Sequence, residues 1–171
     1  MQQMLPAISL ALQNEASERE FYLENSRRTR NAVGREMFAR IAADEEEHYR
    51  LLQQLHERII EAGDQPVMVP AVVADTDIRQ LIAQLPSLAA RTADPDADDI
   101  AAIRTAIDFE KKGIQIYTEL RDSCTVADAR DFFDRLASME RDHCLSLQDS
   151  LLFFEDPEHW HTQHEKPHFE G

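Results

Sequence analysis

Glycine, cysteine and basic residues are all scarce in this chain of 171 residues. Its 4 glycines disfavour turn-rich all-β folds and the glycine-rich loops that hold nucleotides. The chain has 18 lysines and arginines against 33 aspartates and glutamates, which gives a net charge of −15. Nucleic acids and anionic membranes would repel such a surface, whereas cations would be attracted to it.

Long apolar runs are absent as well. No stretch of 18 apolar residues is present, so we expect no membrane-spanning helix. Residues 1–6 have neither the basic start nor the apolar run of a signal peptide. The only cysteines, Cys124 and Cys144, form no CxxC pair. We therefore expect a cytoplasmic location and ordinary packing roles for both thiols.

Four long stretches carry apolar residues at steps of three, four and seven, the pattern of a helix with one buried face. They cover about residues 5–30, 32–61, 94–122 and 125–154. Gly63 is the expected stop of the second stretch. Asp94 with Pro95, and Thr125 with Asp128, are the expected starts of the third and fourth. The pattern predicts an all-α fold, a four-helix bundle over residues 1–155.

A long connection, residues 63–94, separates the second and third predicted helices. We expect residues 76–85 to form one short helix that Pro86 stops. In four-helix bundles a connection of this length carries the chain back along the bundle. Residues 156–171 are predicted to be a polar tail that Trp160 docks on the bundle. For its histidines a solvated or docked tail is favoured over weak metal binding; they are His159, His161, His164 and His168.

The two halves of the chain repeat with an offset of 95 residues and no gaps. Of the 43 positions from residue 11 to residue 53, 13 are identical to their partners, where chance would give roughly 3. The repeat predicts two helical hairpins related by a pseudo-twofold axis. Its identical polar pairs include Glu15/Glu110, Tyr22/Tyr117, Glu45/Glu140 and His48/His143.

Four glutamates and two histidines lie within the apolar stripes. Glu45–His48 and Glu140–His143 are Glu-x-x-His pairs, whose members share one helix face. A lone glutamate, Glu15 or Glu110, precedes the glutamate of each pair by 30 residues, so each hairpin places it opposite its pair. Carboxylates buried together repel one another and lose hydration, unless protons or cations lie among them.

Two divalent cations would neutralise these four carboxylates. Carboxylate with imidazole suits iron, manganese or zinc, and this ligand set occurs in dinuclear carboxylate bundles. We predict that Glu15 and Glu110 each bind one ion and that His48 and His143 each cap one. Glu45 and Glu140 would bridge the two ions.

Some of these residues have a simpler interpretation. A single Glu-x-x-His pair is typical of a solvated acidic face, and only the matched repeat favours a metal site. Tyr22 and Tyr117 are either core tyrosines or hydrogen-bond partners that orient the ligands. Glu18 lies three residues after Glu15, but its repeat partner is Gly113. We therefore expect Glu18 to be a surface residue rather than an extra ligand.

These features resemble the rubrerythrin branch of the ferritin-like superfamily over about residues 5–155. The resemblance rests on both Glu-x-x-His pairs, both lone glutamates with their tyrosines, and the long connection. It implies a non-haem di-iron centre that reacts with peroxide or dioxygen and oxidises ferrous iron, often in a homodimer. The chain lacks the CxxC pairs of a rubredoxin domain, so a separate electron donor is expected. The extra glutamate of rubrerythrins has no equivalent at Ile107 or Gly113.

Three hypotheses follow. The first is a rubrerythrin-like di-iron oxidoreductase. The second is an iron-binding or iron-handling protein with little catalytic turnover, which the acidic charge favours. The third is a purely structural helical protein, in which replacing Glu45 and Glu140 by glutamine would leave the metal content unchanged.

Overall fold

The computed structural model describes residues 1–72, 78–89 and 94–164. Four long helices form the body of the structure. The long helices are α1 (Leu5–Arg28), α2 (Ala32–Ala62), α5 (Ala97–Ser123) and α6 (Ala127–Glu155). The shorter elements are η1 (Gln2–Met4), α3 (Ile78–Ala83), α4 (Leu85–Ala89) and α7 (Pro157–His164). The described residues contain no β-strand. The predicted all-α, ferritin-like bundle is confirmed.

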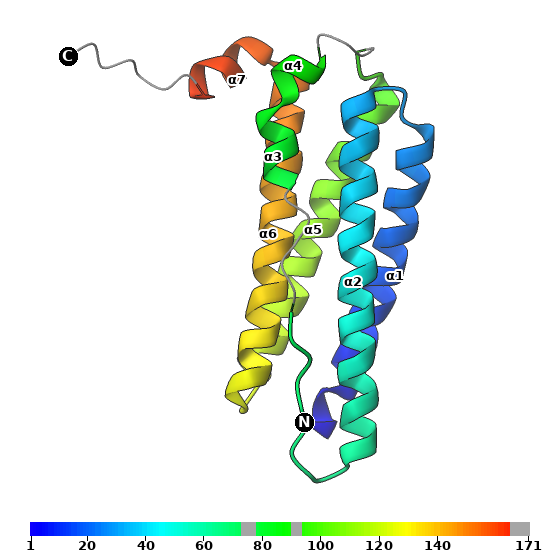
Figure 1. The fold of residues 1–171 in the computed structure, drawn as a ribbon, viewed down its shortest axis with the longest axis vertical. Coiled ribbons are helices and arrows are strands. Elements are labelled where there is room, and N and C mark those ends of the chain that lie inside the picture. The colour runs from blue at the N-terminus through cyan, green and yellow to red at the C-terminus, as the bar shows by residue number, and fades with distance from the viewer. Residues whose placement is uncertain (73–77, 90–93, 165–171) are drawn as a thin grey trace, which may run out of the picture.

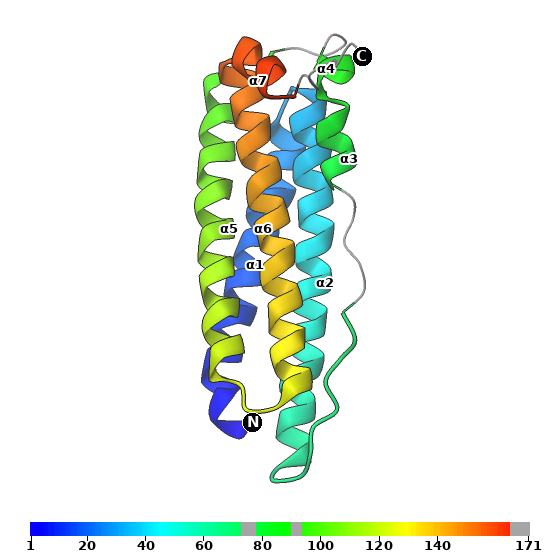
Figure 2. The same cartoon turned by 90° about the vertical axis from the view of Figure 1, so that its left-hand side faces the viewer.

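The long helices pair as two hairpins, α1 with α2 and α5 with α6 (Figure 1). The hairpins meet where α1 contacts α5. The connection that follows α2 runs back along the bundle, and α3 packs against both α2 and α6 (Figure 2). The seam between α2 and α6 is therefore covered by a segment of the crossover.

Local side chains set the ends of α2 and α5. The Asn31 side chain accepts a hydrogen bond from the Gly34 amide at the start of α2. Gly63 ends α2 with a φ of 55°, a conformation that glycine adopts without steric strain. Helix α5 begins after Asp96 rather than at Asp94, because Asp96 and Asp99 form a reciprocal capping box.

Two other sequence predictions are wrong. The start of α6 has Val126 at its N-cap without a side-chain hydrogen bond, so Thr125 and Asp128 are not a capping pair. Pro86 does not stop a single helix, because it lies in the first turn of α4. Proline is tolerated there, since that turn leaves backbone N–H groups unpaired in any case. Residues 76 and 77 lie outside the described residues.

The beginning of the tail forms helix α7, which Trp160 anchors to the bundle. Trp160 is buried, and its ring meets that of Phe153 edge to face at 5.1 Å. The His164 ring stacks on Trp160 at 4.0 Å. No tail histidine within the described residues joins a group able to hold a metal, and His168 lies outside those residues.

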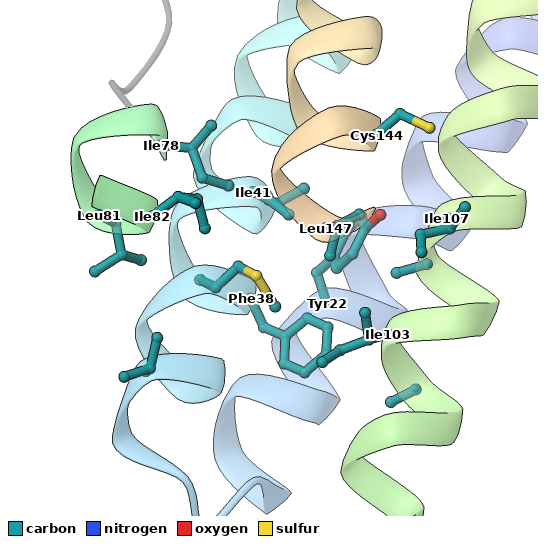
Figure 3. Packing of buried hydrophobic residues seen from close by; sticks show 14 of the residues in the cluster. Tyr22, Phe38, Ile41, Ile78, Leu81, Ile82, Ile103, Ile107, Cys144 and Leu147 are labelled. Carbon is teal, nitrogen blue, oxygen red and sulfur yellow. The ribbon is translucent and has the colours of Figure 1, made fainter. Parts of the chain in front are cut away.

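Two apolar clusters fill the bundle, one at each end. The first cluster includes Tyr22, Phe38 and Ile103, with Ile78 and Leu81 added from α3 (Figure 3). The second cluster includes Leu55, Tyr117, Phe132 and Phe133. On every long helix, a short polar stretch separates the residues of the first cluster from those of the second.

Candidate metal centre

Six ionisable side chains form a polar layer between the two apolar clusters. Helices α1 and α5 each contribute one glutamate, whereas α2 and α6 each contribute a Glu-x-x-His pair; the residues are Glu15, Glu110, Glu45, His48, Glu140 and His143. None is more than 1% exposed. Each lies on the same face as its apolar neighbours one and two turns away, so the burial of the helix face carries the polar residue inward.

The six side chains fall into two overlapping groups of four. One group contains Glu15 and His48, and the other contains Glu110 and His143. Glu45 and Glu140 belong to both groups. Within each group the candidate ligand atoms lie within 4.8 Å of one another. The structure thus brings together all six residues that the sequence singles out.

The histidine rings occupy equivalent places in the two groups. His48 Nδ1 lies 3.1 Å from Glu140 Oε1 and 3.2 Å from Glu45 Oε2. His143 Nδ1 lies 3.3 Å from Glu45 Oε1 and 3.4 Å from Glu110 Oε2. The rings are nearly parallel, with centroids 5.9 Å apart. Each imidazole therefore presents the same nitrogen, Nδ1, to the carboxylates.

Two tyrosines connect the hairpins through this layer. Tyr22 of α1 donates a hydrogen bond to Glu110 Oε1 on α5. Tyr117 of α5 donates one to Glu15 Oε1 on α1. Both hydroxyls are fully buried, so each fixes the lone glutamate of the other hairpin. Of the two interpretations of these tyrosines, the hydrogen-bond partner is the one that the structure shows.

Two of the crowded carboxyl groups hold protons more tightly than exposed ones, whereas a third holds its proton less tightly. Burial, together with the charge of Glu45, raises the pKa of Glu15 to about 8. Burial and the charges of Glu45 and Glu110 raise the pKa of Glu140 well above its usual range. Burial also acts to raise the pKa of Glu45, but the adjacent His48 and His143 rings hold it well below its usual range.

In the two imidazoles, the neighbouring carboxylates outweigh the effect of burial on the pKa. Burial alone lowers the pKa of a histidine, yet the pKa of His48 is raised well above its usual range by Glu45, Glu140 and Glu15. The pKa of His143 is raised in the same way, with Glu110 as the largest raising influence. Positive charge is thus strongly favoured in this layer.

Several polar atoms of the layer have no hydrogen-bond partner among the described residues. They are Glu15 Oε2, Glu45 Oε1, His48 Nε2, Glu110 Oε2, both carboxyl oxygens of Glu140, and His143 Nδ1. Unpaired buried oxygens are rare because each one lacks the stabilisation that water would give. A cation in each group would meet three carboxylates and one imidazole, a donor set suited to iron, manganese or zinc. The residues therefore fit a dinuclear metal centre.

Glu18 is not a surface residue, contrary to the sequence prediction. It is 1% exposed, and its Oε1 accepts a hydrogen bond of 2.7 Å from Asn14. Burial and the charges of Glu45, Glu15 and Glu110 raise its pKa to about 10. Its position three residues after Glu15, on the same helix face, was the available signal. The repeat misled here, because the partner position holds Gly113.

Asp44 is a second residue that the sequence reasoning missed. It is buried, and its Oδ2 lies 3.1 Å from His143 Nε2. In the sequence it begins an acidic run whose exposed member Glu46 pairs with Arg19 at 2.7 Å. Nothing in such a run distinguishes the buried carboxylates from the solvated ones, except their position relative to the apolar stripe.

The two cysteines and the apolar character of the helices agree with the sequence predictions. Cys124 and Cys144 are free and buried, as their expected packing role requires. Among the described helices, none combines the length and the apolar character that crossing a bilayer needs.

Comparison with models of known families matches residues 7–151 to the family described as Rubrerythrin. Searches of curated proteins and of solved structures found no match. The matched region includes all six residues of the polar layer and both tyrosines.

Proposed function

The chain belongs to the rubrerythrin family, and from that premise we propose that it is a non-haem di-iron oxidoreductase that reacts with peroxide or dioxygen and oxidises ferrous iron. The observation that carries the proposal is the pair of overlapping Glu/His groups buried at the centre of the bundle. Helical bundles of this kind use such ligand sets for di-iron and di-manganese centres.

In this proposal Glu15 and His48 hold one iron ion, and Glu110 and His143 hold the other. Glu45 and Glu140, which belong to both groups, are shared between the ions. Bound iron would supply the electrons for reducing the oxidant, with both ions acting as one unit. The unpaired carboxyl oxygens of the layer support this assignment, since they lack other partners among the described residues.

The surrounding protein has three tasks. The apolar clusters above and below the layer exclude water from the carboxylates. Tyr22 and Tyr117 hold the two lone glutamates in fixed orientations. In the metal-free chain the histidines balance the negative charge, because their positive form is favoured beside Glu45 and Glu110, and each would release a proton on binding an ion.

Iron also needs a source of electrons to turn over. The chain has two cysteines, both buried, and neither belongs to a CxxC pair. We therefore include a separate electron donor in the proposal, together with the cytoplasmic location expected from the sequence and the homodimeric assembly that the family resemblance implies.

The test starts from protein loaded anaerobically with ferrous iron. At two iron ions per chain, addition of peroxide should produce a ferric absorbance in the near ultraviolet. Glu46→Gln serves as the control and should give the same absorbance, because Glu46 is an exposed member of the acidic run that contains Glu45. Protein that takes up no iron, or whose spectrum does not change with peroxide, would contradict the proposal.

An iron-handling protein with little turnover is the second candidate, favoured by the net charge of −15. Peroxide consumption in the presence of excess reductant separates the two functions. Many turnovers per chain favour the oxidoreductase. A single stoichiometric oxidation followed by slow iron release favours iron handling.

A further inference from the structure

The two histidines of the polar layer differ on the side that faces away from the carboxylates. His143 Nε2 donates a hydrogen bond to Asp44 Oδ2 across the interface between α6 and α2, at 3.1 Å. Asp44 is 5% exposed, so this contact is protected from water. The hydrogen bond holds a proton on Nε2, so the ring nitrogen available to a metal is Nδ1, which faces the carboxylates.

His48 has no equivalent contact. Its Nε2 is buried and has no hydrogen-bond partner among the described residues. The repeat explains the difference, because the position that matches Asp44 in the second half of the chain is Met139. Met139 is buried within the second apolar cluster. A thioether is at best a weak acceptor, so it cannot replace the missing carboxylate.

An outer carboxylate of this kind affects metal binding in two ways. It fixes the orientation and tautomer of the ring, and it makes the ring nitrogen a stronger donor to the metal. Loss of such a partner commonly lowers metal affinity by about 10- to 100-fold.

On the basis of the proposed metal centre, we propose that Asp44 is a positioning residue for His143 and that the two metal positions are unequal. The position formed by Glu110 and His143 takes a divalent cation first. The position formed by Glu15 and His48 fills second, with an affinity about 10- to 100-fold lower.

Glu18 also breaks the symmetry of the layer, so its effect has to be separated from that of Asp44. Its Oε2 is buried without a partner among the described residues, and it lies on α1 beside Glu15. If Glu18 contributed a ligand on the Glu15 side, it would strengthen the second position and reduce the inequality. Glu18→Gln therefore should leave the order of filling unchanged, or widen the gap between the two affinities.

Stepwise titration with Co²⁺, followed by absorbance and calorimetry, tests the proposal. The wild type should bind two ions in two resolved steps. Asp44→Asn should weaken the first step by about 10- to 100-fold and bring the two affinities together. Glu46→Gln should leave both steps unchanged. Two equal steps in the wild type, or no effect of Asp44→Asn, would overturn the inference while leaving the metal centre intact.

Absence of any Co²⁺ or ferrous iron binding would instead refute the proposed function itself. A second measurement covers the case in which Asp44→Asn does not fold. In wild-type protein labelled with ¹⁵N-histidine, one equivalent of Zn²⁺ should shift the resonances of His143 before those of His48. The opposite order, or simultaneous shifts, would overturn the inference.

Discussion

The first hairpin and the second hairpin of this molecule are alike in the residues that face the centre and unlike one shell further out. Glu15 and Glu110 match, as do the two Glu-x-x-His pairs. By contrast, Glu18 corresponds to Gly113, and Asp44 corresponds to Met139. Both extra carboxylates belong to the first hairpin. The repeat therefore preserves the chemistry at the centre but gives the two proposed metal positions different surroundings.

Removing the residues that both positions share should have the largest effect. Replacing Glu45 and Glu140 together by glutamine removes the two carboxylates common to both groups. We expect the metal content to fall from two ions per chain to nearly none, since each ion would retain one carboxylate and one imidazole. Elemental analysis of protein purified without chelator measures this. Unchanged metal content would support the purely structural hypothesis instead.

The corresponding single variants should differ from each other in metal-free protein. Glu140 has a raised pKa and Glu45 a lowered one, so at neutral pH the first favours its neutral form and the second its charged form. Glutamine mimics the neutral form. Glu140→Gln should therefore stabilise metal-free protein and Glu45→Gln should destabilise it, each by about 1–3 kcal/mol. Chemical unfolding with chelator present provides the measurement, and changes of equal sign would contradict it.

Glu18, present only in the first hairpin, should make the stability of metal-free protein depend on pH. Its pKa is about 10 in the folded chain, against an ordinary value of 4.5. Its contribution to stability is therefore complete below pH 4.5 and is lost as the pH rises towards 10. Unfolding between pH 5 and pH 9 should show this loss.

Glu18→Gln keeps the acceptor for Asn14 without the charge, so it should flatten the profile. We expect a gain on the order of 2 kcal/mol at pH 8. Raised pKa values at Glu15, Glu140 and the histidines act in the same direction, so part of the slope should remain. A variant with the slope of the wild type would show that Glu18 is not neutral in the folded chain.

The sequence predicts the centre of the bundle better than its surroundings. Apolar spacing places the four long helices, and the repeat singles out Glu45 and Glu140 because chance rarely preserves two matched motifs. The same reasoning fails for Glu18 and Asp44, because a buried carboxylate and a solvated one look identical in an acidic sequence. Residues at the edge of a buried helix face are covered or exposed according to how the neighbouring helices are rotated. Only tertiary packing fixes that rotation.

Gly113, the counterpart of Glu18, has a function of its own in the second hairpin. A Cβ atom at this position would lie 3.1 Å from Glu140 Cδ, closer than side-chain atoms normally approach. Gly113→Ala should displace the shared carboxylate and weaken metal binding about tenfold. Helix propensity alone would make the substitution stabilising by up to about 1 kcal/mol.

The effects of Gly113→Ala on folding and on metal binding can be measured separately. The gain in helix propensity should offset the steric cost, so the unfolding midpoint should stay near that of the wild type while the metal affinity falls. Lys112→Ala, at an exposed neighbouring position, is the matched control and should bind metal normally. Equal affinities for both alanine variants would show that Glu140 can move away without loss.

The two tyrosines offer the finest test, because each acts on the hairpin to which it does not belong. Tyr22→Phe removes the hydrogen bond to Glu110, and Tyr117→Phe removes the one to Glu15. Each loss should weaken metal binding by about 0.5–1.5 kcal/mol, a few-fold in affinity. If the two positions fill in sequence, Tyr22→Phe should act on the first step of a Co²⁺ titration and Tyr117→Phe on the second. Each variant serves as the control for the other, so effects confined to the same step would contradict the assignment of Glu110 and Glu15 to separate ions.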